Sequence, residues 1–199
     1  MRNVDQEIRE RWFNDHQATL TKHGDLEVIE WREPGTNIYY CRYVFDKNRI
    51  YISGDIGQAI FDLTWKATIH SFDDINLGYF YSKLSAFSDD KKDFNSDNTV
   101  KRLREWLNNL HEDGTDYDHE EMEELFGRAR SVTEHWEWVE AIHKQESFIS
   151  ELDVDYWEWM YGCGDEIPIR IKGYLIGLKM ASEQLKAVKI EGEIKQCQT

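Results

Sequence analysis

The chain has 199 residues and a formal net charge of −15 at pH 7, a balance that repels nucleic acid and argues against direct binding to it. An aromatic content of 14% supplies material for a hydrophobic core, whereas no apolar run approaches the ~18–20 residues of a membrane span. The first residues lack an apolar signal-peptide segment and the three cysteines cannot all pair, so we expect a cytoplasmic protein in a reducing environment.

The N-terminal half predicts a helix followed by an antiparallel sheet. An apolar stripe that includes Ile8 and Trp12 indicates a helix over residues 3–17. From Leu26 onward the pattern changes to period two, which is typical of strands. The β-forming stretches, separated by turns that contain Gly or Asn, cover residues 26–31, 38–45, 49–53 and 58–64. We therefore expect a β-meander of three to four strands.

From Ser71 onward the sequence predicts mainly helices. Apolar residues recur there at the spacing of one helix face, and Asn, Asp and Thr residues stand where helix caps are expected. The expected helices cover residues 77–84, 99–110, 119–129, 133–144, 153–161 and 169–185. The fold class is therefore α+β: an N-terminal helix and antiparallel β-meander, followed by a mainly helical, acidic C-terminal part. These parts are residues 1–98 and 99–199, either as two domains or as one continuous domain.

Almost all of the net charge lies in residues 105–166. This segment holds 19 Asp and Glu residues against three basic residues, a net charge of −16, whereas the other 137 residues sum to +1. It also contains eight Trp and Tyr residues, which acidic disordered tails lack, so we expect it to fold. Like charges at i,i+3 and i,i+4 repel one another, so a partner that carries Lys and Arg would stabilise such a surface.

The helix expected over residues 119–129 concentrates these carboxylates. Its apolar side consists of Met122, Leu125, Phe126 and Ala129. Proteins that bind nucleic acid carry Lys and Arg residues spaced for phosphates, and an acidic face can occupy such a surface. The residues expected to contact this basic partner are Asp116, Asp118, Glu120, Glu121, Glu123 and Glu124. An acidic face that only keeps the protein soluble is the alternative.

Two Trp-Glu-Trp sequences stand 21 residues apart, at residues 136–138 and 157–159. In amphipathic segments, one Trp of each pair would be buried and the other would lie near the surface. Because Trp is enriched at binding hot spots, Trp138 and Trp159 are further candidates for contact with the partner.

Catalytic signatures are weak. Cys41 lies mid-strand like a small core residue, and the carboxylates near Cys163 would raise its pKa. The carboxylates and histidines of residues 111–120 lack EF-hand spacing, and no zinc-type spacing of Cys and His occurs. We therefore predict no catalytic residue, no metal site and no cofactor. A metal-dependent hydrolase or nuclease that uses clustered carboxylates is the alternative.

Three stretches together resemble a group of small proteins encoded by phages and prophages: residues 52–61 (ISGDIGQAIF), 76–84 (NLGYFYSKL) and 174–185 (YLIGLKMASEQL). The resemblance covers scaffold positions, roughly two-fifths of the chain, and no catalytic motif or acidic segment is part of it. It implies a host–phage setting, in which small acidic proteins often resemble inhibitors of bacterial defence, anti-CRISPR proteins among them.

Charge and resemblance together predict an inhibitor of a bacterial defence nuclease, of the anti-CRISPR kind, in the cytoplasm of the bacterial host. It would bind the basic nucleic-acid-binding surface of the effector and block access of the nucleic acid, without catalysis. The alternatives are the metal-dependent hydrolase or nuclease and a structural or regulatory phage protein that has no dedicated acidic site.

Overall fold

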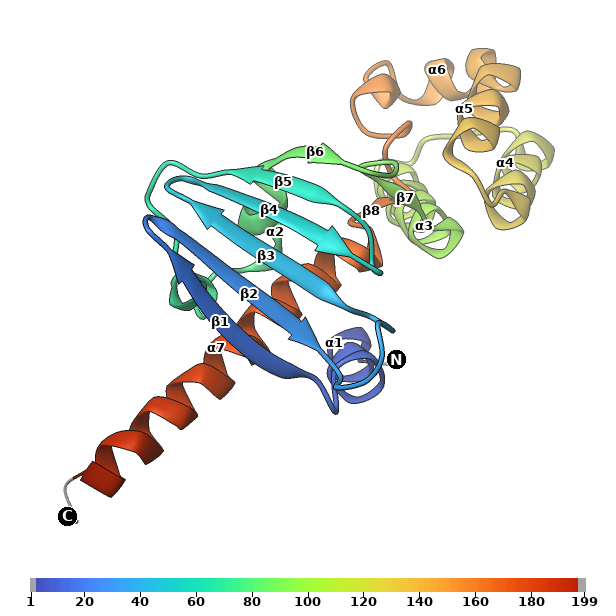
Figure 1. Cartoon of the computed structure of the whole chain (residues 1–199). Coiled ribbons are helices and arrows are strands. Elements are labelled where there is room, and N and C mark those ends of the chain that lie inside the picture. Colours follow the sequence, from blue (N-terminus) through green and yellow to red (C-terminus); the bar gives the residue numbers. More distant parts are fainter. Residues whose placement is uncertain (1–2, 197–199) are drawn as a thin grey trace. The chain divides into compact units, whose positions relative to one another are not determined.

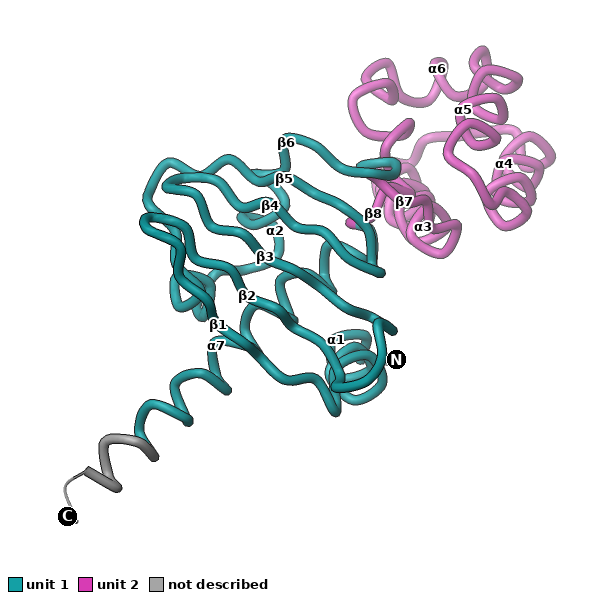
Figure 2. The backbone as a smooth tube through the Cα atoms, in the orientation of Figure 1, with its two compact units in different colours: residues 1–91, 168–199 teal, residues 92–167 magenta. Residues whose placement is uncertain are grey.

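The computed structural model describes residues 3–196, with side chains placed through residue 190. The chain forms two compact units (Figure 2): the sheet unit, residues 1–91 with 168–199, and the helical unit, residues 92–167. The first boundary lies after residue 91 rather than after residue 98, and the C-terminal helix, which the sequence placed in the helical part, belongs to the sheet unit. Among the described helices, none is long and apolar enough to cross a membrane.

An antiparallel meander of six strands builds the sheet unit, with the strands in chain order across the sheet (Figure 1). The strands are β1 (Gln17–His23), β2 (Leu26–Arg32), β3 (Cys41–Asp46), β4 (Arg49–Gly54), β5 (Ala59–Asp62) and β6 (Leu84–Phe87). The α+β class is confirmed, but the expectation of three to four strands is too low. The two unexpected strands, β1 and β6, are edge strands with mostly exposed side chains, so the apolar alternation that marks a buried strand is weak in them.

The N-terminal helix is shorter than expected. It consists of α1 (Val4–Glu7), capped by the side chain of Asn3, and a π-helical turn, η1 (Ile8–Trp12). Phe13 ends the helical segment, so residues 14–17, which were expected to continue the helix, lie outside it, and Gln17 begins β1. Ile8 and Phe13 are fully buried, which confirms the apolar stripe and explains why even a short helix is held in place.

The C-terminal helix α7 (Ile169–Gln196) runs across one face of the sheet (Figure 1). Its backbone approaches the strands closely at Gly177, where an added Cβ would lie 2.4 Å from Oη of Tyr43 and 3.3 Å from Cδ1 of Trp31. Oη of Tyr43 donates a hydrogen bond of 3.2 Å to the backbone carbonyl of Tyr174. A residue without a side chain is therefore required where the helix meets the buried aromatic rings of the sheet.

Aromatic side chains complete the core of the sheet unit. The strands alternate buried and exposed residues, as their period-two pattern predicted. The short helices η2 (Ile69–Phe72) and α2 (Leu77–Ser82) add rings to this core. Phe61 of β5 stacks on Phe80 with ring centroids 4.1 Å apart, and Phe80 meets Phe72 edge-on at 5.9 Å. Each large apolar side chain buried in this way contributes about 1.5–3 kcal/mol.

The helical unit has a core of its own. Its elements are β7 (Asp93–Phe94), α3 (Ser96–Glu112), α4 (His119–Ser131), α5 (His135–Lys144), α6 (Glu146–Leu152), η3 (Tyr156–Glu158) and β8 (Asp165–Glu166). The fully buried side chains at its centre are Leu103, Leu125, Ala129, Trp138, Ile142, Ile149 and Met160. The helix expected over residues 153–161 is wrong, since only a 3-10 turn forms there. The carboxylate of Asp153 accepts a hydrogen bond from the backbone N–H of Asp155, a turn that competes with helix formation.

Candidate partner-binding surface

Negative charge is concentrated in the helical unit. Residues 92–167 hold 21 acidic and seven basic residues, a net charge of −14, whereas the rest of the chain sums to −1. A field this localised attracts cationic surfaces and repels polyanions.

Helix α4 separates apolar from acidic residues. Its buried side chains are Met122, Leu125, Phe126 and Ala129, the four expected from helical spacing. Asp118 caps the helix, because its Oδ1 accepts hydrogen bonds from the backbone N–H groups of Glu120 (2.8 Å) and Glu121 (3.2 Å). A carboxylate at this position also interacts favourably with the helix dipole. Asp118 therefore has a structural role, whatever else it contacts.

The exposed glutamates of α4 are not equivalent. Glu124 forms an ion pair with Arg128, one turn further along the helix, at 3.2 Å. The side chains of Glu120 and Glu123 have no ion pair or hydrogen bond within the described part of the chain. These two carboxylates are therefore available to a partner without the loss of an existing contact.

Glu121 contributes to packing as well as to charge. Its Oε2 and its backbone carbonyl accept hydrogen bonds from Nε2 of Gln145, at 3.0 Å and 2.9 Å. Gln145 lies at the junction of α5 and α6 and is only 6% exposed. Replacing Glu121 would disturb a buried amide, which makes it a poor position for testing charge alone.

Two of the basic residues in this unit lie together. Arg128 and Lys144 line one cleft of about 200 Å³ with Trp136. Each of them also forms an i,i+4 ion pair with a glutamate of its own helix. Glu120 and Glu123 lie nearer the N-terminal end of α4 and do not line this cleft. The positive charges of Arg128 and Lys144 therefore do not compensate their negative charges.

Asp116 lies in the loop between α3 and α4. Its Oδ1 accepts a hydrogen bond of 3.1 Å from the backbone N–H of Tyr117, whose hydroxyl oxygen lies 2.8 Å from Nε2 of His111. The loop is thereby tied to the end of α3. The exposed carboxylate of Asp116 consequently stands on an ordered loop rather than a free one.

Helix α5 begins with a capping box. Oε2 of Glu137 accepts hydrogen bonds from the backbone N–H groups of Thr133 (2.8 Å) and Glu134 (3.1 Å). These bonds lower the pKa of the Glu137 carboxyl. The glutamate between the first pair of tryptophans therefore serves as a helix cap in its ionised form.

The Trp-Glu-Trp sequences each place one ring further inside than the other, as expected. Trp138 is fully buried, and its Nε1 donates a hydrogen bond of 2.8 Å to the backbone carbonyl of Met160. Trp138 thus belongs to the core and presents no surface to a partner. Trp159 is half-buried, whereas Trp136 and Trp157 are 63% and 59% exposed.

The exposed rings, Trp136 and Trp157, are the ones that the sequence did not single out. For the first pair, a local signal existed: Trp138 shares one face of α5 with the apolar Ala141 and Ile142, so helical spacing alone identifies it as the buried member. The second pair lies in an irregular segment, where no periodicity distinguishes the two rings.

The structure also places the groups that were weighed as metal ligands and two of the three cysteines. Within the described residues, no group of three or more His, Cys, Asp or Glu side chains is arranged to hold a metal ion. Burial raises the pKa of Cys41 to about 12 and that of Cys163 to about 11. For Cys163 the main cause is burial, not the neighbouring carboxylates that the sequence suggested. Both thiols are therefore protonated at neutral pH and weakly nucleophilic. Cys197 lies outside the described residues.

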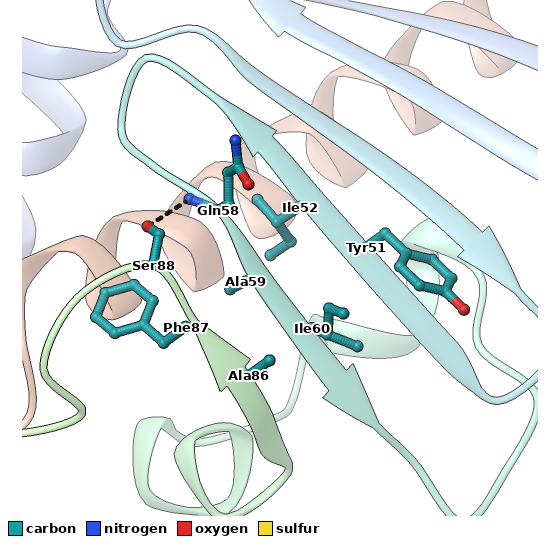
Figure 3. A pocket seen from close by; sticks show the side chains of 8 residues that line it. All are labelled: Tyr51, Ile52, Gln58, Ala59, Ile60, Ala86, Phe87 and Ser88. Atoms are coloured by element: carbon teal, nitrogen blue, oxygen red, sulfur yellow. Dashed lines mark hydrogen bonds between the residues drawn. The ribbon is translucent and has the colours of Figure 1, made fainter.

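A hollow of about 360 Å³ lies over β4, β5 and β6 in the sheet unit (Figure 3). Its lining residues are Tyr51, Ile52, Gln58, Ala59, Ile60, Ala86, Phe87 and Ser88. The hollow lies beside small side chains, those of Ala59 and Ala86. The pairing of β5 with β6 also shifts register there, between Ile60 and Phe61. The lining contains no carboxylate and no basic side chain, so it differs in chemistry from the acidic surface of the helical unit.

Comparisons with protein-family models, with curated proteins and with solved structures find no match to this chain. The resemblance of three stretches to phage-encoded proteins stays a prediction from sequence. Function must therefore be inferred from the charges and surfaces of the molecule itself.

Proposed function

We propose that this protein inhibits a bacterial defence nuclease of the CRISPR type by occupying the basic surface on which that nuclease binds nucleic acid. The observation that carries the proposal is the net charge of −14 on the helical unit, with Glu120 and Glu123 exposed and uncompensated. The phage-like stretches of the sequence support the host–phage setting, in which the protein acts in the cytoplasm of the infected bacterium.

Electrostatics explains how binding would inhibit. A nuclease channel holds Lys and Arg residues at phosphate spacing, and binding of a polyanion there releases counterions. An acidic, folded surface is attracted to the same residues, and complementary fields accelerate encounter. Once bound, it excludes nucleic acid by charge repulsion and by volume. The residues proposed to contact the channel are Asp116, Glu120, Glu123 and Glu124, with Glu121 and Asp118 also holding the helix in place.

This mechanism is stoichiometric and requires no cofactor. Inhibition should therefore increase with the molar ratio of protein to effector until it saturates. It should persist when divalent metal is chelated while the binding of nucleic acid to the effector is measured. A metal-dependent hydrolase would instead act at substoichiometric amounts and lose its effect with the chelator.

The experiment has a cellular arm and a purified arm. The protein is expressed in a bacterial strain whose CRISPR system targets a plated phage, and restored plaque formation is the expected result. Purified effector is then incubated with labelled target DNA and increasing amounts of protein in EDTA, and a gel-shift assay measures the fraction of DNA bound. Stoichiometric loss of bound DNA is expected.

Several results would count against the proposal. Unrestored plaques across CRISPR types, with unchanged DNA binding by the purified effectors, would favour a structural or regulatory phage protein. Degradation of the DNA by the protein itself in Mg²⁺, abolished by EDTA, would favour the hydrolase.

A further inference from the structure

A second feature of the helical unit is a cleft of about 260 Å³ beside α3, called here the α3 cleft. Its lining residues are Arg102, Glu105, Trp106, Asn109, Asp153 and Trp159. Four of them recur at i, i+3, i+4 and i+7 along α3 and so lie on one face of that helix. The volume is below the roughly 300–1,000 Å³ of drug-sized ligand sites, so the α3 cleft suits a single side chain.

Two indole rings contribute to the wall of the α3 cleft. The ring centroids of Trp106 and Trp159 are 5.9 Å apart, with their planes inclined at 55°. Nε1 of Trp159 donates a hydrogen bond of 3.0 Å to Oδ2 of Asp153, and Oδ1 of Asp153 accepts one of 2.9 Å from the backbone N–H of Asp155. The half-buried ring of Trp159 is therefore held in a fixed orientation before any ligand arrives.

The charged and polar groups of the α3 cleft favour a cation. Glu105 and Asp153 supply two carboxylates, whereas the one cation, Arg102, is paired with Glu105 at 2.8 Å. The side-chain amide of Asn109 has no hydrogen-bond partner within the described part of the chain, and its oxygen can accept from a ligand N–H. The lining is thus net negative and lies in a unit whose net charge is −14.

We propose that the α3 cleft binds the guanidinium group of an arginine side chain. Indole rings attract cations through their faces, and a guanidinium group stacks on such a ring while its N–H groups reach carboxylate and amide oxygens. A lysine ammonium group is a compact, strongly hydrated point charge that cannot combine stacking with forked hydrogen bonding. The identity of the arginine's owner rests on the proposed function, since a nucleic-acid-binding surface is rich in arginine.

The test uses the full chain and L-argininamide as the probe. Titration of ¹⁵N-labelled protein, followed by ¹H–¹⁵N correlation spectra, should give saturable shifts of the Trp159 indole signal and of the backbone signals of residues 102–109. L-lysinamide and a neutral monosaccharide should give much smaller shifts. The variant Trp159→Leu identifies the indole signal and should weaken binding about tenfold, in line with a partly desolvated cation–π contact.

Matched variants keep the test decisive. Glu105→Gln changes an exposed position conservatively and should weaken binding several-fold with the fold intact. Trp157→Leu and Glu158→Gln make the same chemical changes at exposed positions of η3 that do not line the α3 cleft, and they should leave the affinity for L-argininamide unchanged.

Absence of saturable shifts at residues 102–109 would overturn the inference, as would equal affinities of Glu105→Gln and the parent for L-argininamide. Stronger shifts with the monosaccharide than with L-argininamide would also overturn it. These results are independent of nuclease inhibition. If charge reversal on α4 abolishes inhibition but the protein does not bind L-argininamide, only the proposal that the α3 cleft binds arginine is rejected. L-argininamide binding in a protein that inhibits no nuclease would reject the proposed function alone.

Discussion

Reversing the charge of Glu120 and Glu123 separates the acidic surface from the fold. The double change Glu120→Lys/Glu123→Lys alters the net charge of the helical unit from −14 to −10. Both side chains are exposed and lack a side-chain partner within the described residues, so no contact is lost. Glu121 and Glu124 stay unchanged, because one contacts Gln145 and the other pairs with Arg128.

The expected cost to stability is small. Glu120 lies in the first turn of α4, where losing a favourable dipole interaction costs about 0.3–1 kcal/mol. Relief of repulsion between Glu120 and Glu124 returns about 0.2–0.5 kcal/mol, and Glu123 should change stability by no more than about 0.5 kcal/mol. The net change is within about 1 kcal/mol, so the midpoint of thermal unfolding should move by no more than about 4 °C in a chain of this size.

The expected cost to binding is much larger. Two lysines would face the partner's Lys and Arg residues, and such juxtaposition costs about 2–4 kcal/mol. Inhibition of DNA binding should therefore weaken roughly 30- to 1,000-fold. The assay is the gel shift with purified effector, accompanied by thermal unfolding monitored by circular dichroism.

The matched control is Asp74→Lys/Asp90→Lys, which makes the same change in charge at exposed positions of the sheet unit. It should inhibit like the parent. If Glu120→Lys/Glu123→Lys also inhibits like the parent, α4 is only a solvated face and the electrostatic mechanism is refuted. If both double variants lose inhibition equally, total charge matters and the position of the surface does not.

Three further predictions concern the fold. Trp138→Phe should destabilise the protein by about 2–4 kcal/mol, since it opens space in the core and removes the indole hydrogen bond to the Met160 carbonyl, which keeps only the N–H of Cys163. Trp136→Phe should change stability by less than about 0.5 kcal/mol in the same urea titration. Gly177→Ala should destabilise the protein because its Cβ would clash with the buried hydroxyl group of Tyr43. The control Gly127→Ala, in an exposed part of α4 with no atom nearby, should raise stability by about 0.5–1 kcal/mol. Equal effects of the two changes would contradict the close approach of α7 to the sheet. Burial lowers the pKa of His16, so its contribution to the free energy of unfolding is complete above the unfolded-state pKa of 6.5 and is lost as the pH falls below that value. Between pH 7.5 and 5.5, stability should therefore decline more steeply in the parent than in His16→Asn. Parallel curves would exclude His16 as the cause of the decline.

Local patterns were sufficient where the structure depends on local interactions. The spacing of Met122, Leu125, Phe126 and Ala129 identified the buried side of α4, because a helix that packs on one core buries one stripe. The cap at Asp118 agrees with the expectation of an Asn, Asp or Thr residue before each helix, since a carboxylate that binds the first free N–H groups lies within three residues of them in the sequence.

Contacts between distant segments left weaker signals. The sequence did not indicate β1, because only Ala18 and Leu20 of its residues are even half-buried and its pairing with β2 depends on the turn at Gly24. The position of α7 depends on the close approach of Gly177 to the hydroxyl group of Tyr43. A glycine in a helix is visible in the sequence, but the strand that requires it is not.

Salt should affect the free protein and its complex in opposite directions, and this contrast follows from the core that the helical unit possesses. The apolar side of α4 fixes the fold, so the exposed carboxylates of Glu120 and Glu123, which have no ion pair or hydrogen bond within the described residues, oppose folding by repulsion and are not needed for packing. Raising the salt from about 50 to 150 mM shortens the Debye length to about 8 Å and weakens this repulsion. The midpoint of thermal unfolding of the free protein should therefore rise.

The same screening weakens attraction to a basic partner, so the dissociation constant of the complex should rise as well, mainly through slower association. An unfolding midpoint that falls with salt would show that the acidic residues stabilise the unit through their own contacts. A dissociation constant that does not change would show that an apolar surface, such as the exposed rings of Trp136 and Trp157, contributes most of the affinity.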